Sequence, residues 1–346
     1  MAKQQVDERR RLRRQKFLRR TEQARFAREA GASAYAHYLE VRSWARRLYG
    51  ACATTNPAFT PEERAVAAGL SPLWEATPGM IAELRRWCQP MSNNGPADYE
   101  SSSSALAKRL RRDLKRQFME VGRDLFVPEP DILGAFGYEA EGGRYNADTL
   151  KFFNALVALQ DAAVLGDLRS GGRRLVWEPG GGWGGFAYQL KTVCPEITYL
   201  ITGVPELLLV SAVYLKTVCP GARCRLFDPA CPDSTWKGWD TVDFVFAPEA
   251  ALPDLRPPRL DLAVDLLCLR HLNPARLETH IQWAFESNGR YFYSMHSDSY
   301  CTGDLPAVWR ALERRYWIHP VPPRIEVAKA DVEYSHAVGW KRLLRG

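Results

Sequence analysis

The sequence of 346 residues lacks long hydrophobic runs, paired cysteine motifs and an apolar N-terminal segment. No stretch approaches the roughly 18 consecutive apolar residues that a membrane-spanning helix needs. The N-terminus, MAKQQVDERRRLRRQKFLRR, has no apolar core that could serve as a signal peptide. The eight cysteines form no CxxC pair and no regular framework, which argues against structural disulfides and a zinc knuckle. We therefore expect a cytoplasmic protein without a membrane partner and without a metal site.

A generally basic surface is also absent, although the formal net charge is +7. Residues 1–50 contain 14 Lys and Arg against 5 Asp and Glu, and the rest of the chain carries a net charge of −2. The stretch RRRLRRQKFLRR is rich in helix-forming residues. We predict a basic helical arm that packs on a partner subunit through its apolar side, and hence a homo-oligomer. A nucleic-acid-binding arm is the alternative.

Three regions follow one another along the chain. Residues 1–50 form the basic helical arm, and residues 51–170 are predicted to form a helical cap or lid. A polar linker rich in Pro, Gly and Ser, residues 89–104, interrupts this cap. Residues 171–346 alternate apolar strands with helices, which predicts the cofactor-binding domain.

Polar residues mark the start of two helices in the cap. Thr60 precedes a proline and two glutamates, the residue types that favour the first turn of a helix. Asn146 or Asp148 is expected to cap a later helix with an apolar face. Both helices therefore have defined starting points.

The last region contains short apolar segments separated by helical patterns. Strands are predicted at 173–179, 197–203, 242–248, 260–267 and 290–296. Helices are predicted at 184–194, 205–219, 273–287 and 304–317. The segment 323–344 is expected to add two strands as an antiparallel edge pair. This alternation predicts an α/β fold with a Rossmann-like parallel sheet, covered by helices on both faces and preceded by a helical region.

A glycine-rich turn, VWEPGGGWGGFAYQL, joins the first predicted strand to its helix. Its glycines fit both GxGxxG, typical of dinucleotide enzymes, and ExGxGxG, typical of S-adenosylmethionine-dependent methyltransferases. Such a turn lets the backbone approach a ligand, and the following helix directs unpaired N–H groups toward it. A tight turn without a ligand is the alternative.

The acids at the strand ends help to choose between these cofactors. Glu178 ends the first strand, where methyltransferases commonly place an acid near the methionine part of the cofactor. Gly203 stands where an acid would bind the ribose, and Glu206 follows three residues later. An unusual ribose contact is therefore expected, and a nicotinamide-dependent reductase remains a distant alternative.

Five blocks in order resemble the bacterial sugar O-methyltransferase family, whose members are class I S-adenosylmethionine-dependent enzymes. These blocks are GGRYNADTLKFF, EPGGGWGG, GVPELLLVSAVYL, DLLCLRHLNPARLETHI and RYFYSMH. The resemblance implies a class I methyltransferase sheet, S-adenosyl-L-methionine as the cofactor, and methyl transfer to a hydroxyl of a sugar or sugar-containing metabolite. The cofactor-binding residues that it implies are Glu178, Gly180, Gly181, Gly182, Gly184 and Glu206. Trp183, an aromatic residue inside the glycine-rich turn, is also expected near the cofactor. Tyr145 and Asn146 would lie near the acceptor.

A sugar hydroxyl is a poor nucleophile at neutral pH, so a general base is useful. His271 and His296 follow or end two neighbouring strands, and Asp265 could orient a histidine or bind an acceptor hydroxyl. We predict these three as catalytic residues. The alternatives are an N-methyltransferase acting on a small molecule, an RNA methyltransferase that uses the basic arm, and a degenerate subunit that binds without catalysing.

Overall fold

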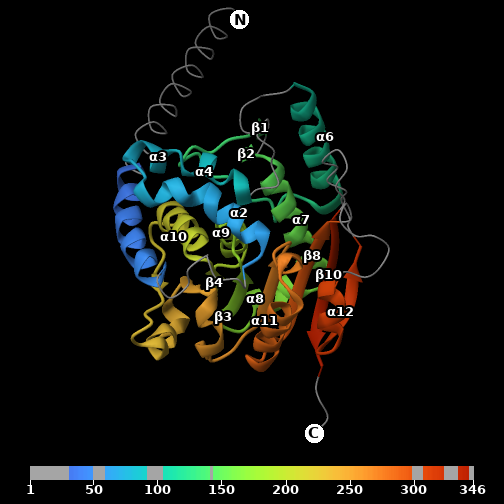
Figure 1. Cartoon of the computed structure of the whole chain (residues 1–346). Coiled ribbons are helices and arrows are strands. Elements are labelled where there is room, and N and C mark those ends of the chain that lie inside the picture. The colour runs from blue at the N-terminus through green and yellow to red at the C-terminus, as the bar shows by residue number, and fades with distance from the viewer. Residues whose placement is uncertain are drawn as a thin grey trace, which may run out of the picture.

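The computed structural model describes residues 31–49, 59–91, 104–140, 143–297, 307–322 and 334–342 (Figure 1). Most of the predicted basic arm and most of the predicted linker lie outside these residues. The fold is of the α/β class, with one large sheet between helices. The described part of the chain therefore contains the glycine-rich turn and the elements around it.

Within the described residues, eight strands form one sheet in the order β5-β6-β4-β3-β7-β8-β10-β9. Their bounds are β3 Arg174–Pro179, β4 Ile197–Gly203, β5 Cys224–Leu226, β6 Phe244–Pro248, β7 Leu262–Leu266, β8 Tyr291–Ser297, β9 Tyr316–Val321 and β10 Tyr334–Lys341. Strands β3 to β8 pair in parallel, and β10 runs antiparallel to both of its neighbours. From β3 the chain forms β4, the edge strand β5 and then β6 on one side, and it crosses afterwards to β7 on the other side of β3. Ligands of open α/β sheets bind at such a switch point, beyond the carboxyl ends of the strands.

The structure confirms the Rossmann-like α/β fold and each of the five predicted parallel strands. The predicted antiparallel pair at the edge of the sheet is present, because β10 pairs with the edge strand β9. The bounds need a correction, since β9 precedes the predicted segment 323–344. The edge strand β9 includes Tyr316 and Trp317, which we expected to end a helix. Tyr316 is buried and Trp317 is exposed. Tyr316 pairs with Lys341 and Trp317 with Trp340 of β10, so the antiparallel ladder holds both residues in the sheet.

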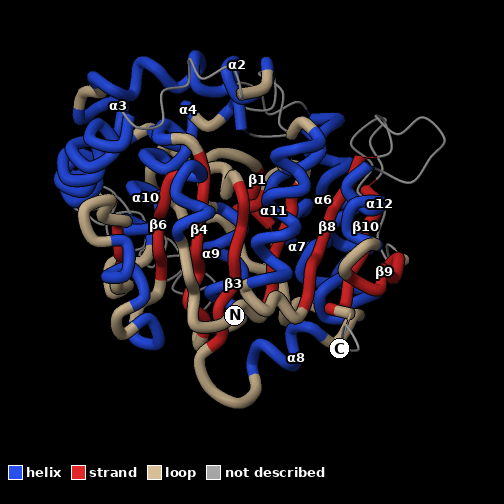
Figure 2. Tube along the Cα trace, turned by 60° about the horizontal axis from the view of Figure 1, so that its bottom comes forward, coloured by secondary structure: helices blue, strands red, loops and turns tan. Residues whose placement is uncertain are grey.

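Helices cover both faces of the sheet (Figure 2). On one face pack α7 Ala147–Asp161, α9 Gly185–Val193 and α10 Pro205–Val218, and on the other pack α11 Pro274–Glu286 and α12 Ala307–Glu313. The short helix α8 Val164–Arg169 leads into β3. Trp177 of β3 shows how tightly the α11 face is packed: its ring lies 4.6 Å from the Trp283 ring, and its Nε1 donates to Thr202 Oγ1 at 2.9 Å.

Short helices form a cap over the carboxyl ends of the strands (Figures 1 and 2). They are α2 Pro61–Leu70, α3 Pro78–Ala82 and α4 Leu84–Trp87, followed by the 3₁₀ helix η2 Gln89–Met91. As predicted, Thr60 caps α2: its hydroxyl accepts from Glu63 N at 3.2 Å, and the Glu63 carboxylate accepts from Thr60 N at 2.7 Å. This reciprocal cap fixes the first turn of α2 at the rim of the sheet.

Two further elements pack beside this body. Helix α6 Ser104–Val121 lies against α7, next to the hairpin of β1 Tyr138–Ala140 and β2 Gly143–Tyr145. The helical residues 31–49 lie beside α10, where Glu40 and Lys216 form an ion pair at 2.7 Å. Tyr38, Trp44 and Leu48, which belong to the predicted apolar stripe, are buried against the same chain. A subunit contact through residues 1–30 stays a prediction outside the described residues.

Candidate functional site

The glycine-rich turn after β3 depends on backbone conformations that favour glycine. Gly180, Gly181, Gly182 and Gly184 all have positive φ angles, between +48° and +87°. A Cβ atom at Gly181 would lie 2.2 Å from Cγ2 of Ile201, so this part of the turn is packed directly on β4. A Cβ atom at Gly182 would meet nothing within 4 Å. The turn is therefore rigidly seated on the protein and open on one side, as a ligand cradle requires.

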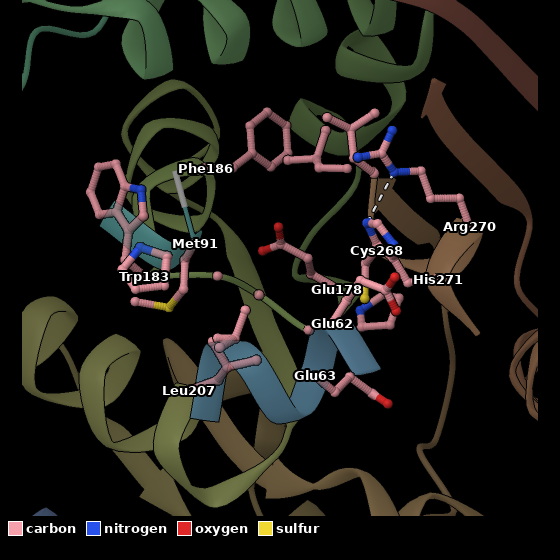
Figure 3. A pocket seen from close by; sticks show the side chains of 18 of the residues that line it. Glu62, Glu63, Met91, Glu178, Trp183, Phe186, Leu207, Cys268, Arg270 and His271 are labelled. Carbon is pink, nitrogen blue, oxygen red and sulfur yellow. Dashed lines mark hydrogen bonds between the residues drawn. The ribbon is translucent and has the colours of Figure 1, made fainter. Parts of the chain in front are cut away.

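A cavity of about 440 Å³ lies at the carboxyl ends of β3 and β7. Its walls are the glycine-rich turn, the segment that follows β7, and residues of α2, η2 and α7 (Figure 3). Trp183, Phe186 and Leu207 form an apolar side, and Arg270 and His271 lie on the opposite side. The volume is in the range of small-molecule binding sites.

Glu178 occupies the centre of this cavity, and its carboxylate points into the open space (Figure 3). The side chain is buried, and among the described residues one hydrogen bond reaches it, from the Tyr199 hydroxyl to Oε2 at 2.9 Å. Burial raises the pKa of Glu178 to about 8, against the opposing effects of the Tyr199 hydrogen bond and the positive charge of Lys151. A buried carboxyl group that has no ion pair among the described residues favours a positively charged ligand group.

Lys151 is a cavity residue that the sequence reasoning missed. It lies on α7, it is buried, and its ammonium is 3.5 Å from Asp148 Oδ1 and 4.8 Å from the centre of the Phe152 ring. Its signal in the sequence is a single charge within the apolar segment LKFFNALVAL. A lysine is seldom fully buried unless it is paired, so a charge at such a position suggests a polar contact inside the fold.

The structure gives Asp265 a positioning role at the end of β7. Its Oδ1 accepts from the backbone N–H groups of Cys268 at 2.9 Å and Leu269 at 3.0 Å, and its Oδ2 accepts from Ser294 Oγ at 2.9 Å. Asp265 does not line the cavity, but the turn that it holds does. Leu267 in this turn has a φ of +68°, a strained conformation for a residue with a side chain. Asp265 thus holds a strained cavity wall in place.

The two predicted histidines lie in different surroundings. His271 lines the cavity, and its Nε2 accepts from Arg270 Nε at 3.0 Å (Figure 3). Burial, with a smaller contribution from the Arg270 charge, lowers the pKa of His271, which favours the neutral ring. His296 is buried outside the cavity, where its Nε2 lies 2.8 Å from Ser294 Oγ and its ring meets the edge of Trp309. Of the two, His271 alone borders the cavity.

Some of the predicted cofactor-binding residues line the cavity, and others lie outside it. Gly180, Gly181, Gly182 and Trp183 line the cavity with Glu178, but Gly184 and Glu206 do not. Gly184 caps α9 in a left-handed conformation, packed against Leu215. Glu206 is buried, it shares a hydrogen bond with the Trp74 side chain, and burial raises its pKa. It therefore points from α10 toward the cap rather than into the cavity.

Tyr145 and Asn146, predicted near the acceptor, are both buried outside the cavity. Tyr145 packs in a small cluster with Leu110 and Leu114 of α6. Of the two residues expected to cap α7, Asn146 and Asp148, the structure shows that Asn146 is the cap. Its Oδ1 accepts from Thr149 N at 3.1 Å. Its amide also donates to Glu129 and to the Phe136 carbonyl oxygen. In the structure these two residues hold the start of α7.

Two ion pairs, one buried and one half-buried, fasten the cap to both sides of the cavity. Arg85 of α4 is fully buried, donates twice to Glu129 at 2.7 and 3.1 Å, and places its guanidinium 3.5 Å from the centre of the Trp183 ring. On the other side, Arg276 of α11 donates to both oxygens of Glu63 at 2.6 and 2.7 Å. The cap is therefore an integral wall of the site.

No protein-family model matches the chain, and no curated protein matches it. The N-methyltransferase NodS from Bradyrhizobium japonicum WM9, solved with S-adenosyl-L-homocysteine, is 16% identical, with 53% of this chain and 86% of that chain covered and a TM-score of 0.34. The N-terminal domain of EvdMO1, solved with S-adenosylhomocysteine and D-fucose, is 16% identical, with 72% and 100% covered and a TM-score of 0.35.

A third solved structure is 1,6-didemethyltoxoflavin-N1-methyltransferase from Burkholderia thailandensis. It is 15% identical, with 72% of this chain and 93% of that chain covered and a TM-score of 0.37. Similarity at this level does not determine what the cavity binds, so the assignment of a function rests on the site itself.

Among the described residues, no helix is both long enough and apolar enough to cross a membrane. No group of three or more His, Cys, Asp or Glu side chains among them is arranged to hold a metal ion.

Proposed function

We propose that the protein is an S-adenosyl-L-methionine-dependent methyltransferase that methylates a hydroxyl group of a sugar or sugar-containing metabolite. The observation that carries this proposal is the cavity at the switch point between β3 and β7, where the glycine-rich turn surrounds the buried carboxylate of Glu178. A buried carboxyl group beside an open backbone cradle suits a cofactor that carries positive charge, because a nearby cation favours the ionised form of the carboxyl group.

The residues present fit such a cofactor. The open side of Gly182 allows close approach of a ligand, and Trp183 and Phe186 offer apolar walls. The end of β4 supplies no acid for the ribose, because Gly203 packs there with its Cβ position 3.3 Å from the Gly180 carbonyl oxygen. When bound, S-adenosylmethionine would supply an electrophilic methyl group. This chain would bind it, keep water away and orient the acceptor.

The acceptor side is the polar rim made by Glu62 from the cap and by Arg270 and His271 after β7. These groups can donate to and accept from hydroxyls, which suits a sugar. In methyl transfer the acceptor oxygen forms a bond to the methyl carbon, the carbon–sulfur bond breaks, and the hydroxyl proton goes to a base. His271 could take this proton at Nε2 only after Arg270 releases that atom. If His271 does not take the proton, the protein would accelerate the reaction mainly by aligning the acceptor oxygen with the methyl group.

A labelling experiment tests this function. The wild-type protein is incubated with methyl-labelled S-adenosylmethionine and a panel of hydroxyl-bearing and amino-bearing sugars, and the products are separated by chromatography. We expect label on a sugar oxygen. Label on nitrogen would replace the O-methyltransferase by an N-methyltransferase, and S-adenosylmethionine binding without transfer to any acceptor would favour the non-catalytic alternative.

A second candidate, an RNA methyltransferase, is favoured by the exposed face of α6. Five cations lie on this face: Lys108, Arg111, Arg112, Lys115 and Arg116. Such a stripe could contact phosphates, although aromatic residues for base stacking are missing from it. Adding RNA to the labelling panel, with an R112E/K115E variant as control, separates the candidates. RNA methylation that falls in this variant and with rising salt would favour RNA.

A further inference from the structure

Two buried residues that line the cavity carry charges of opposite sign. Glu178 and Lys151 both line it, both are buried, and they come from different elements, β3 and α7. The positive charge of Lys151 is close enough to lower the pKa of Glu178. Burying such groups is costly unless each is paired, so their presence calls for a partner.

The neighbouring charges are already matched within the chain. Arg85 is paired with Glu129 through two hydrogen bonds, and Asp148 lies 3.6 Å from Arg85 and 3.5 Å from Lys151. This leaves Glu178 without an ion pair among the described residues. Lys151, with three N–H donors, makes one ion pair there, to Asp148. Each side of the cavity thus has capacity for one further charged group.

We propose that Glu178 and Lys151 together form a clamp for the α-amino acid end of the cofactor, with the ligand ammonium on Glu178 and the ligand carboxylate on Lys151. This inference rests on the proposed function and makes it more specific. An α-amino acid carries both charges on one carbon, so one ligand group satisfies both buried residues. The clamp also gives a reason for a lysine in the apolar core of α7. It makes Lys151 a specificity-determining residue, which selects nucleosides that keep their amino acid end.

Three probes separate the two halves of the clamp: S-adenosylhomocysteine, its decarboxylated analogue, and 5′-methylthioadenosine, which lacks the whole amino acid end. With the wild-type protein, calorimetry should show that loss of the ligand carboxylate weakens binding roughly 10- to 100-fold, as expected for a buried charge-assisted hydrogen bond. In Lys151→Met, S-adenosylhomocysteine and its decarboxylated analogue should bind equally, while 5′-methylthioadenosine keeps its wild-type affinity.

The controls distinguish recognition from folding. Lys191→Met removes a comparable half-buried lysine, ion-paired to Asp243 at 2.7 Å and outside the cavity, and should leave all three affinities unchanged. Lys151→Arg should restore part of the preference for the carboxylate. Binding of the three nucleosides to the wild-type protein requires no variant. It therefore shows whether the protein recognises the ligand carboxylate even if Lys151→Met does not fold.

Two results would overturn the clamp alone. One is wild-type protein that binds S-adenosylhomocysteine and its decarboxylated analogue equally. The other is a Lys151→Met variant that keeps the wild-type preference. If the wild-type protein binds none of the three nucleosides, the proposed function fails and the clamp fails with it.

Discussion

Buried carboxylates stand at the ends of two neighbouring strands, Glu178 at the end of β3 and Asp265 near the end of β7, and the fold uses them differently. Asp265 accepts two backbone N–H groups and the Ser294 hydroxyl. Glu178 accepts from Tyr199, and the rest of its carboxylate faces the cavity. One acid is occupied by its own turn, and the other keeps its capacity for a ligand.

Local covalent structure explains the difference. After Asp265 the chain turns back, so that the N–H groups three and four residues later reach its short side chain. After Glu178 comes Pro179, which has no N–H, and the N–H of Gly180 donates to the Thr202 carbonyl oxygen instead. The two residues that follow Glu178 therefore donate no backbone N–H group to its carboxylate. Which strand-end acid binds a ligand thus depends on the turn that follows it.

The largest expected effect is on stability at the β7 side. Asp265→Ala leaves the N–H groups of the Cys268 turn and the Ser294 hydroxyl without their acceptor, which should lower the free energy of unfolding by about 3 kcal/mol. Urea denaturation measures this loss, with Ser294→Ala as a smaller perturbation of the same network. A loss below about 1 kcal/mol would mean that Asp265 does not hold the turn.

A pair of glycine substitutions probes the β3 side. Gly181→Ala places a methyl group against Ile201 in a left-handed conformation, and should lower the free energy of unfolding by about 2 kcal/mol. Gly182→Ala has the same backbone strain but open space, so it should cost less stability and instead weaken S-adenosylhomocysteine binding. Thermal unfolding and calorimetry on both variants test this contrast. Equal effects of the two on binding would contradict the assignment of Gly182 to the open side.

The pH dependence of stability should reveal the unpaired state of Glu178. Because burial raises its pKa to about 8, the folded protein holds a proton that the unfolded chain has already lost above its usual pKa. The stabilising contribution of Glu178 is full below that usual value and is lost as pH rises to about 8. Between these limits Glu178→Gln should gain stability over wild type by on the order of 1 kcal/mol per pH unit.

The measurement for this prediction is urea unfolding of both proteins at several pH values, in which the shared titrations of all other groups cancel. A difference between wild type and variant that stays constant with pH would show that Glu178 is paired within the chain. Excess S-adenosylhomocysteine should reduce the slope, because its ammonium would keep the carboxylate ionised.

The smallest expected effect concerns His271. Replacing Arg270 by Gln removes a nearby positive charge, the second cause of the low pKa of His271 after burial, so this pKa should rise slightly while staying below its usual value. A pH titration followed by NMR of the histidine ring signals measures it. A fall in the His271 pKa would contradict the arrangement of the rim.

Much of this site could be predicted from the sequence, because its main parts are local. The strands are short apolar segments, the turn is marked by its glycines, and Glu178 immediately precedes them. Thr60 could likewise be predicted as a helix cap from the proline and the two glutamates that follow it. Each of these features is specified within a few residues, so pattern and chemistry coincide.

The residues that could not be predicted depend on contacts between distant segments. Lys151 reaches the cavity because α7 packs beside α9, and the cap residue Arg85 meets Trp183 across almost a hundred residues. His296 lies near the end of β8, as predicted, but its side chain lies on the side of the sheet that meets Trp309. The strand end was predictable and the direction of the side chain was not, because successive residues of a strand face opposite ways.

The central claim is that the cavity around Glu178 holds the amino acid end of a methyl-donor nucleoside. Isothermal titration calorimetry of the wild-type protein with S-adenosylhomocysteine tests it most directly, with Glu178→Gln measured in parallel. We predict one binding site per chain with a Kd tighter than about 100 μM, weakened roughly tenfold or more in the variant. No binding by wild type at about 1 mM ligand, or equal affinity of the two proteins, would contradict the claim.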